Sequence, residues 1–233
     1  MLLGSYELLI NDPTSFLRLT VLVAVSLLVA VTVHEFSHAL VATGLGDATA
    51  KRLGRLSLNP KRHLDPAGTV MMLVAGFGWG KPVPVNQHNL AHGQTGMALV
   101  AAAGPLTNVM VAFLLALPIK LGLLEWSAPA LNRVSYVMTG GLPEGLADIL
   151  GLLIFFNILL AVFNLIPLAP LDGSKVLAGL LPRNQAQSYA RLERYGPALL
   201  VGLIMLDYIS NLGLLWGVIG PAVRALATVA TGY

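Results

Sequence analysis

The sequence of 233 residues contains no cysteine and few charged residues. Without cysteine there is no disulfide framework, thiolate metal site or cysteine nucleophile, so any metal ion must be held by His, Asp or Glu. Only 11% of the residues are charged and 56% are hydrophobic, whereas ordinary soluble domains carry about 25% charged residues. These values predict a membrane protein. The net charge of +3 is spread over several segments, which argues against a nucleic-acid partner.

Three apolar runs are long enough to cross a bilayer, which requires about 20 mostly apolar residues. They predict spans at residues 17–45, 95–119 and 149–171. The C-terminal region 195–225 is also apolar, but Asp207 interrupts it, so it forms either one long helix or two short ones. The sequence therefore predicts an all-α polytopic bundle of about four to six transmembrane segments, occupying residues 1–233 as one domain.

Two further segments, residues 66–86 and 1–16, are not expected to cross the bilayer. Residues 66–80 contain four glycines and are too short to cross the bilayer. Irregular backbone at membrane depth persists where protein or a watery cavity satisfies its polar groups, so we expect a re-entrant or β-like element at 66–86; a plain surface loop is the alternative. Residues 1–16 lack a basic segment, which indicates a short lead-in rather than a signal peptide.

Lysine and arginine collect in two of the segments that connect the spans. Residues 47–90 and 172–194 are both rich in them, whereas the segment between the second and third spans holds only Lys120 and Arg133. Cytoplasmic loops are enriched in these residues. We therefore expect 47–90 and 172–194 to be cytoplasmic.

The first span ends in the sequence His34-Glu35-Phe36-Ser37-His38. Residues four apart share one face of a helix, so both imidazoles can reach one metal ion while Glu35 stays free to hold a water molecule. His34 follows Arg18 by sixteen residues, about 24 Å of helix, which places it within a hydrocarbon core about 30 Å thick. The pattern predicts a zinc hydrolase site inside the membrane. Alternatively, the histidines only hydrogen-bond to neighbouring helices.

A catalytic zinc ion normally takes three protein ligands and one water molecule. Asp172 ends the third apolar run, just after Pro167 and Pro170 break the helix. The first and third spans run in the same direction, so Asp172 reaches the same side of the membrane as His34 and His38. We expect it to be the third ligand; the alternative is that it caps a helix starting near Ser174.

At this point the sequence resembles the site-2 protease family of intramembrane zinc metalloproteases, in its compact form without a PDZ or CBS domain. The hallmarks of this family are the motif H-E-x-x-H in one span and the motif N-x-x-P…D-G in a later span. The matching residues are His34 to His38, Asn164, Pro167, Asp172 and Gly173, and the similarity extends to Ser57–Pro60, His63–Thr69, Gly76–Asn86 and Ala103–Asn108.

The resemblance implies peptide-bond hydrolysis inside a prokaryotic cell membrane, with transmembrane proteins as substrates. It implies that His34, His38 and Asp172 hold one Zn²⁺ ion and that Glu35 is the general base. The resemblance also gives roles to two asparagines. Asn108 either stabilises the oxyanion or only forms a hydrogen bond between helices. Asn164 contacts either Asp172 or the substrate.

A helical substrate must unwind before its carbonyl groups can be attacked, and an exposed strand edge can then pair with it. The element that contains Gly76 and Gly78 and continues into Lys81-Pro-Val-Pro-Val is the candidate edge, because its glycines permit close approach and its prolines limit unwanted pairing.

The other histidines have simpler interpretations. We expect His63 to be a satisfied turn residue, and His88 and His92 to be solvated. The competing function is an intramembrane metal-binding protein or transporter, since His and Asp also line ion paths. A third is an inactive relative that binds membrane helices without cutting them. The sequence leaves the oligomeric state open.

Overall fold

The computed structural model describes residues 6–75, 78–126 and 142–233. The described part is helical and contains no sheet. Its helices are α1 (Tyr6–Asn11), α2 (Pro13–Gly44), α3 (Thr49–Arg52), α4 (Pro66–Ala75), α5 (Gly93–Lys120), α6 (Leu142–Asn164), α7 (Asp172–Leu180), α8 (Arg183–Glu193), α9 (Gly196–Ser210) and α10 (Leu214–Thr231), with 3₁₀ turns at Pro60–Arg62 and Gln87–Asn89.

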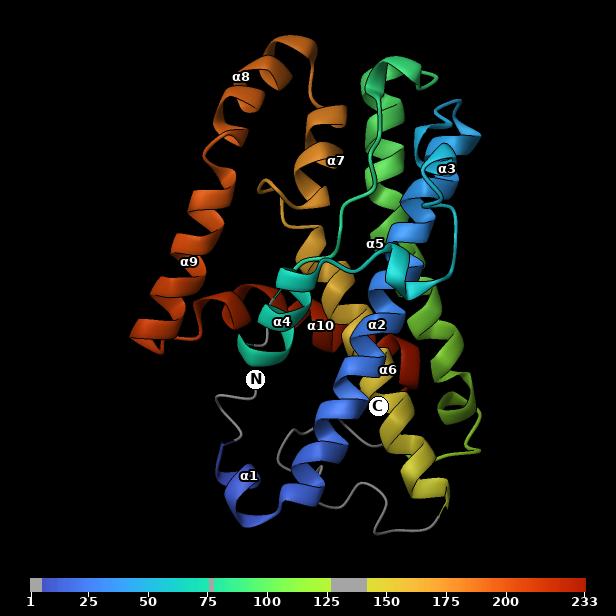
Figure 1. The fold of residues 1–233 in the computed structure, drawn as a ribbon, viewed down its shortest axis with the longest axis vertical. Coiled ribbons are helices and arrows are strands. Elements are labelled where there is room, and N and C mark those ends of the chain that lie inside the picture. Colours follow the sequence, from blue (N-terminus) through green and yellow to red (C-terminus); the bar gives the residue numbers. More distant parts are fainter. Residues whose placement is uncertain (1–5, 76–77, 127–141) are drawn as a thin grey trace.

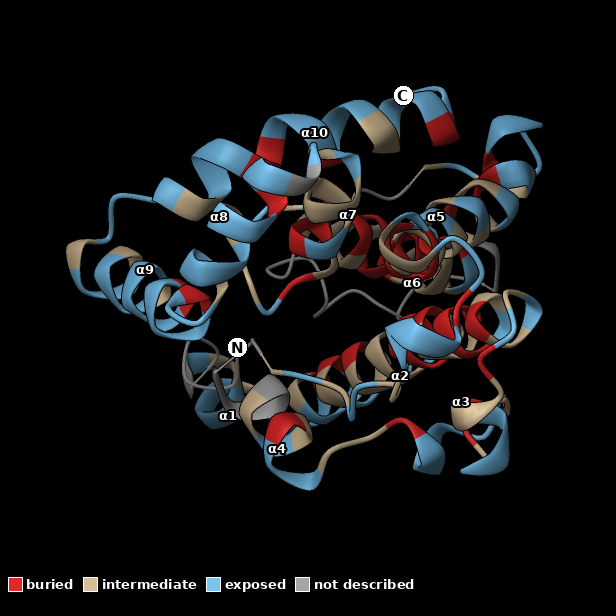
Figure 2. Cartoon of the chain, turned by 90° about the horizontal axis from the view of Figure 1, so that it is seen from above, coloured by how far each residue is buried: buried red, intermediate tan, exposed pale blue. Residues whose placement is uncertain are grey.

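Four of these helices are long and apolar enough to cross a membrane, namely α2, α5, α6 and α10. The predicted all-α polytopic class is thereby confirmed. Helices α2, α5 and α6 lie side by side, and the buried residues concentrate on the faces that they turn toward one another (Figures 1 and 2). Helix α10 runs transverse to α5 and α6 in Figure 1 and packs against both, while α8 and α9 lie to one side of these helices.

The C-terminal region consists of two helices rather than one. The carboxylate of Asp207 in α9 accepts hydrogen bonds from the backbone N–H groups of Leu214 and Leu215, where α10 begins. The charged residue that interrupts the apolar run thus satisfies otherwise unpaired donors at a helix N-terminus.

The third apolar run is helical only as far as Asn164. Residues 165–171 are non-helical, and α7 then begins at Asp172. Pro167 and Pro170 lie in this stretch; proline has no N–H to donate, so it disfavours continuation of a helix. After the break, α7 packs against α5.

The element expected at 66–86 to be re-entrant or β-like begins with a short helix and continues as irregular backbone. Residues 66–75 form α4, and strand pairing in the described part is limited to one isolated bridge between Leu64 and Gly80. The chain from Gly80 to Asn86, which we call the strap, contains neither helix nor sheet. Pro82 and Pro84 suppress regular pairing here because they lack N–H groups.

Asp47 fixes the far end of the strap to the end of α2. Its side chain is fully buried and accepts hydrogen bonds from the backbone N–H of Asn86 at 2.6 Å and from the amide of Asn89 at 3.2 Å. Thr49 donates through its backbone N–H and its hydroxyl. Burial alone raises the pKa of the Asp47 carboxyl, but these donors outweigh it and lower the pKa from 3.8 to about 2.

We predict that Asp47→Asn destabilises the protein by about 1–3 kcal/mol near neutral pH, because one acceptor oxygen becomes an NH₂ group facing other donors. Since the folded-state pKa is lowered, wild-type Asp47 contributes its stability above pH 4 and loses it as the pH falls from about 4 toward 2. Thermal unfolding in detergent should therefore show a lower melting temperature for the variant than for wild type, and this difference should narrow as the pH falls through this range. A difference independent of pH would contradict the assignment.

Candidate metal centre

Three potential metal ligands converge where α2, α5 and α7 meet. His34 and His38 lie one turn apart on α2 and are buried, and Asp172 is the first residue of α7. The Nε2 atoms of His34 and His38 lie 2.9 Å and 3.2 Å from Oδ2 of Asp172. Their potential ligand atoms all lie within 4.8 Å of one another. The structure thus brings together the three residues that the sequence predicted as ligands.

The Nδ1 atoms of both imidazoles are hydrogen-bonded to oxygens of α5. His34 Nδ1 lies 2.7 Å from Oδ1 of Asn108, and His38 Nδ1 lies 2.7 Å from the backbone carbonyl of Val100. The side-chain NH₂ group of Asn108 donates to two other oxygens, so its Oδ1 is the atom left to face His34. Because both partners are acceptors, each Nδ1 carries a proton, and each Nε2 of a neutral imidazole carries the lone pair.

The atoms that converge are therefore all lone-pair donors, which repel one another unless a proton or a cation lies between them. Two imidazoles and one carboxylate form a donor set that zinc takes in catalytic sites. Ligand atoms at about 2.0–2.1 Å from a tetrahedral zinc ion lie roughly 3.3 Å apart, close to the observed 2.9 Å and 3.2 Å. The residues present fit a zinc ion.

Gly104 lets α5 approach the two histidines closely. A Cβ atom at this position would lie 2.6 Å from Nε2 of His38 and 2.7 Å from Cε1 of His34. Contacts this short are not tolerated, so any larger residue would displace the imidazoles or the helix. The hydrogen bonds from α5 to both rings depend on this close approach.

Glu35 is not part of the ligand cluster. It is half-buried, and its Oε2 accepts a hydrogen bond of 3.1 Å from the backbone N–H of Val83 in the strap. Glu35 lines a cavity of about 360 Å³ together with the three ligands and the residues Gly78, Gly80, Val83, Leu160, Phe163, Asn164 and Lys175, among others. A carboxylate outside the ligand cluster therefore shares a cavity with a potential metal site.

Comparison with known proteins gives a match to the family described as Peptidase family M50 across residues 22–206. The chain belongs to this family, the site-2 proteases.

Named relatives agree with membership of family M50. The chain is 38% identical over 172 residues to "Putative zinc metalloprotease YwhC" of Bacillus subtilis, covering 74% of each chain. The chain is also similar to two proteins described as "Putative zinc metalloprotease Rip2". It is 29% identical to the one from Mycolicibacterium smegmatis and 27% identical to the one from Mycobacterium tuberculosis, and each match covers 83% of this chain and 70% of the relative. No solved structure matches significantly. With four apolar helices, these findings support a membrane metalloprotease.

The structure shows the contacts of Asn108 and Asn164, the two asparagines singled out in the sequence. Asn108 is fully buried, and its side chain forms hydrogen bonds with His34, Ala30 and Asn157. These bonds join α5 to α2 and α6, which agrees with the expected alternative of a hydrogen bond between helices. Asn164 lines the cavity but donates its amide to Leu160 in its own helix, so the expected bond to Asp172 is not present in the described structure.

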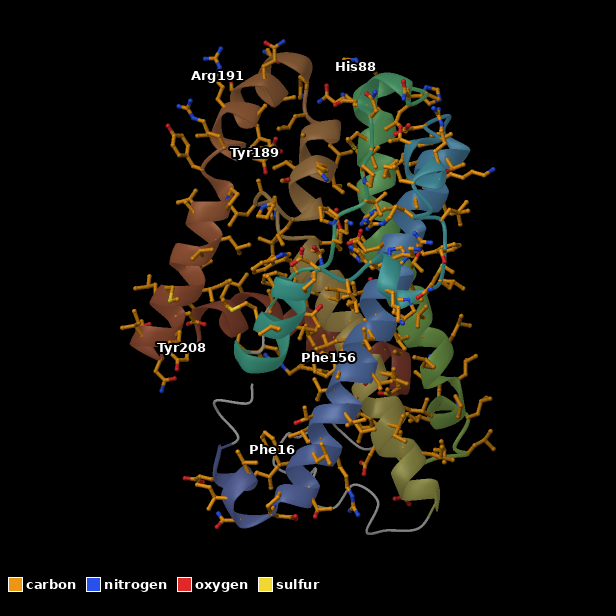
Figure 3. The ribbon with its side chains drawn as sticks, in the orientation of Figure 1. Phe16, His88, Phe156, Tyr189, Arg191 and Tyr208 are labelled. Carbon is orange, nitrogen blue, oxygen red and sulfur yellow. The ribbon has the colours of Figure 1, made fainter. Side chains whose placement is uncertain are left out.

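The structure also places the glycines and the other histidines that the sequence singled out. Gly78 lines the cavity, whereas Gly76 lies outside the described residues. His63 is fully buried, with Nε2 2.6 Å from the carbonyl oxygen of Ser57. His88 and His92 are exposed; Figure 3 shows His88 at the end of the bundle near the start of α5, away from the centre of the helices.

Sequence reasoning missed Asn157, which lies fully buried in α6 and accepts a 2.8 Å hydrogen bond from Asn108. An amide in an otherwise uncharged span was the available signal, because polar groups inside the membrane require partners. Nothing in the sequence marked Asp47 or Arg55 among the other charged residues of the basic segment. Both are buried and hold the strap.

We predict that Gly104→Ala abolishes stoichiometric zinc binding, because the new methyl group would overlap both imidazoles. Gly202→Ala in α9 is the matched control, since a Cβ atom there has no neighbour within 4 Å. Zinc content is measured after purification by atomic emission, with thermal unfolding as the test of folding. Full zinc content in a folded Gly104→Ala variant would contradict the assigned ligand geometry.

Proposed function

We propose that this M50 protein is a zinc-dependent endopeptidase that hydrolyses peptide bonds within or near the transmembrane segments of other proteins, in the process called regulated intramembrane proteolysis. The observation that carries the proposal is the convergence of two imidazoles and a carboxylate beside a glutamate outside this cluster in one cavity. The cavity lies among helices that are long and apolar enough to span a membrane.

Two features support a site within the bilayer near its cytoplasmic side. His34 follows Arg18 by sixteen residues of continuous helix, about 24 Å of a hydrocarbon core about 30 Å thick. The segments 47–90 and 172–194, which are rich in Lys and Arg, include α3 and α8, and these lie toward one end of the molecule (Figure 1). The positive-inside rule assigns that end to the cytoplasm.

In the proposed mechanism, His34, His38 and Asp172 would hold the zinc ion. When bound, zinc would supply Lewis acidity, which polarises a carbonyl oxygen and lowers the pKa of water to about 7. Glu35 accepts the proton of the attacking water and then delivers it to the leaving amine, so the same carboxylate serves as general base and general acid. Asn108 and Val100 keep the two imidazoles in the tautomer and orientation that ligation requires.

An unwound substrate would lie along the strap. The N–H groups of Lys81 and Val83 are already used within the protein, and Pro82 and Pro84 have none. From Pro82 to Pro84 the strap backbone therefore offers carbonyl acceptors but no free N–H donors. Pairing then depends on the N–H groups of the substrate, which become available only after its helix has opened. This arrangement favours substrates whose helices unwind easily.

Replacing Glu35 separates hydrolysis from metal binding. We predict that Glu35→Gln keeps zinc but loses cleavage of a model transmembrane substrate by about 10²–10⁴-fold, as expected on removal of a general base. His34→Ala should lose both zinc and activity. Purified variants are compared for zinc content and for product formation in detergent or liposomes.

The outcomes distinguish the competing functions. Normal cleavage by Glu35→Gln would contradict the protease mechanism. Zinc loss in that variant would mean that Glu35 is a ligand rather than the base. Zinc flux through wild-type protein in liposomes, without cleavage of any membrane helix, would support the alternative of a transporter.

The substrate class is tested by changing helix stability on the substrate side. We predict that replacing each glycine near the cytoplasmic end of a cleaved helix by leucine slows cleavage about fivefold, because leucine stabilises a helix by roughly 1 kcal/mol over glycine. Leucine substitutions at the opposite end of the same helix are the control. Equal rates for all of these substrates would show that local unwinding does not limit cleavage.

A further inference from the structure

Arg55 is a buried cation that belongs to no part of the proposed mechanism. Its residue is only 5% exposed, although arginine is almost never buried without a partner. Its Nη2 donates to the backbone carbonyl of Lys81, the second residue of the strap. Its Nε is buried with no hydrogen-bond partner in the described structure. The charge is thus bonded to the strap, and it also interacts electrostatically with Glu35.

The loop that carries Arg55 contacts the same end of the strap in two other ways. The N–H of Lys81 donates to the carbonyl of His63 at 2.7 Å, and Leu64 forms the isolated bridge with Gly80. The N–H and the C=O of Lys81 are therefore both bonded to residues of 55–64. We call residues 55–64 the buttress loop.

The strap in turn holds the carboxylate of Glu35. Two residues beyond Lys81, the N–H of Val83 donates to Oε2 of Glu35. The other oxygen, Oε1, lies 3.6 Å from the place where a Cβ atom at Gly80 would stand. Pro82, whose ring fixes φ, links the two contacts and restricts their relative movement. The position of the strap therefore sets the position of Glu35.

We propose that Arg55 is a positioning residue for the reaction: by fixing the Lys81 carbonyl, it holds the strap in the register that orients Glu35 toward the metal ligands. This inference rests on the proposed function. Arg55 acts through the strap and touches neither the ligands nor the substrate in this role.

The anchoring of the strap at both ends separates this role from a general role in folding. Asp47 holds the strap at Asn86, independently of the buttress loop. Loss of the Arg55 contact therefore leaves the strap attached at its far end, while the part from Gly80 to Val83 is free to shift. The metal ligands come from α2 and α7 and make no contact with Arg55 that the structure records. Zinc binding should accordingly survive when Glu35 is misplaced.

The test uses full-length protein and the variants Arg55→Gln and Arg55→Lys, with Arg52→Gln, an exposed arginine of α3, as the matched control. We expect Arg55→Gln to lower kcat about tenfold or more, as misplacement of a catalytic group does, with zinc content equal to wild type. Arg55→Lys should recover part of the activity, because an ammonium group still donates to the Lys81 carbonyl.

A double-mutant cycle with Gly80→Ala provides a readout that a purely structural role would not produce. The new methyl group would lie 3.0 Å from Val31 and 3.2 Å from the His63 carbonyl, so it displaces the same end of the strap. If both substitutions act by shifting the strap, the double variant loses little more activity than the worse single variant. Gly80→Ala also keeps the proposal testable if Arg55→Gln fails to fold.

Three results would overturn the inference while leaving the proposed protease function intact. They are activity in Arg55→Gln equal to that of Arg52→Gln, zinc loss in step with activity loss, and fully additive effects of Arg55→Gln and Gly80→Ala. A wild-type protein that binds zinc but cleaves no membrane helix would contradict both proposals.

Discussion

The candidate centre depends on two hydrogen bonds that α5 makes to the imidazoles of α2. In apolar surroundings a polar atom without a partner is costly, so the bonds from Asn108 and Val100 hold both rings with their Nδ1 atoms turned away from the cavity. Both Nε2 atoms then face Asp172. Glycine at position 104 permits the helix contact that makes this possible. Ring orientation, protonation and ligand convergence therefore follow from the packing of two helices.

The third ligand requires a break in helical structure. Helix α6 ends at Asn164, and residues 165–171, with their two prolines, are non-helical. Asp172 then begins a new helix that packs against α5. The amide of Gln94 in α5 donates to the carbonyl of Ala178 in α7, which ties the two helices together. A carboxylate at a helix N-terminus is also favoured by the helix dipole.

The sequence predicted the ligand cluster better than its surroundings, for a physical reason. The i, i+4 spacing of His34 and His38 is a local helical property, and the lack of cysteine left few other residues able to complete a site. The partners of these ligands are set by contacts between distant segments. Asn157 meets Asn108 only because α5 and α6 pack together. The composition of 66–86 indicated irregular backbone, but not the contacts that the strap makes with the buttress loop and with Asp47.

The strap explains why buried charges occur in a segment that the sequence presents as an ordinary basic loop. Asp47 and Arg55 have opposite charges, and each forms a hydrogen bond with the strap backbone at one end. A backbone segment with two prolines has few N–H groups and makes no sheet, so few backbone hydrogen bonds fix its position. Side chains from neighbouring segments supply further anchors. Charged groups form stronger hydrogen bonds than neutral ones, and an Arg and an Asp suit this task because one donates to a carbonyl while the other accepts from N–H groups. Between these anchors, the N–H of Val83 meets Glu35. The two buried charges thus hold in place the backbone that holds the glutamate.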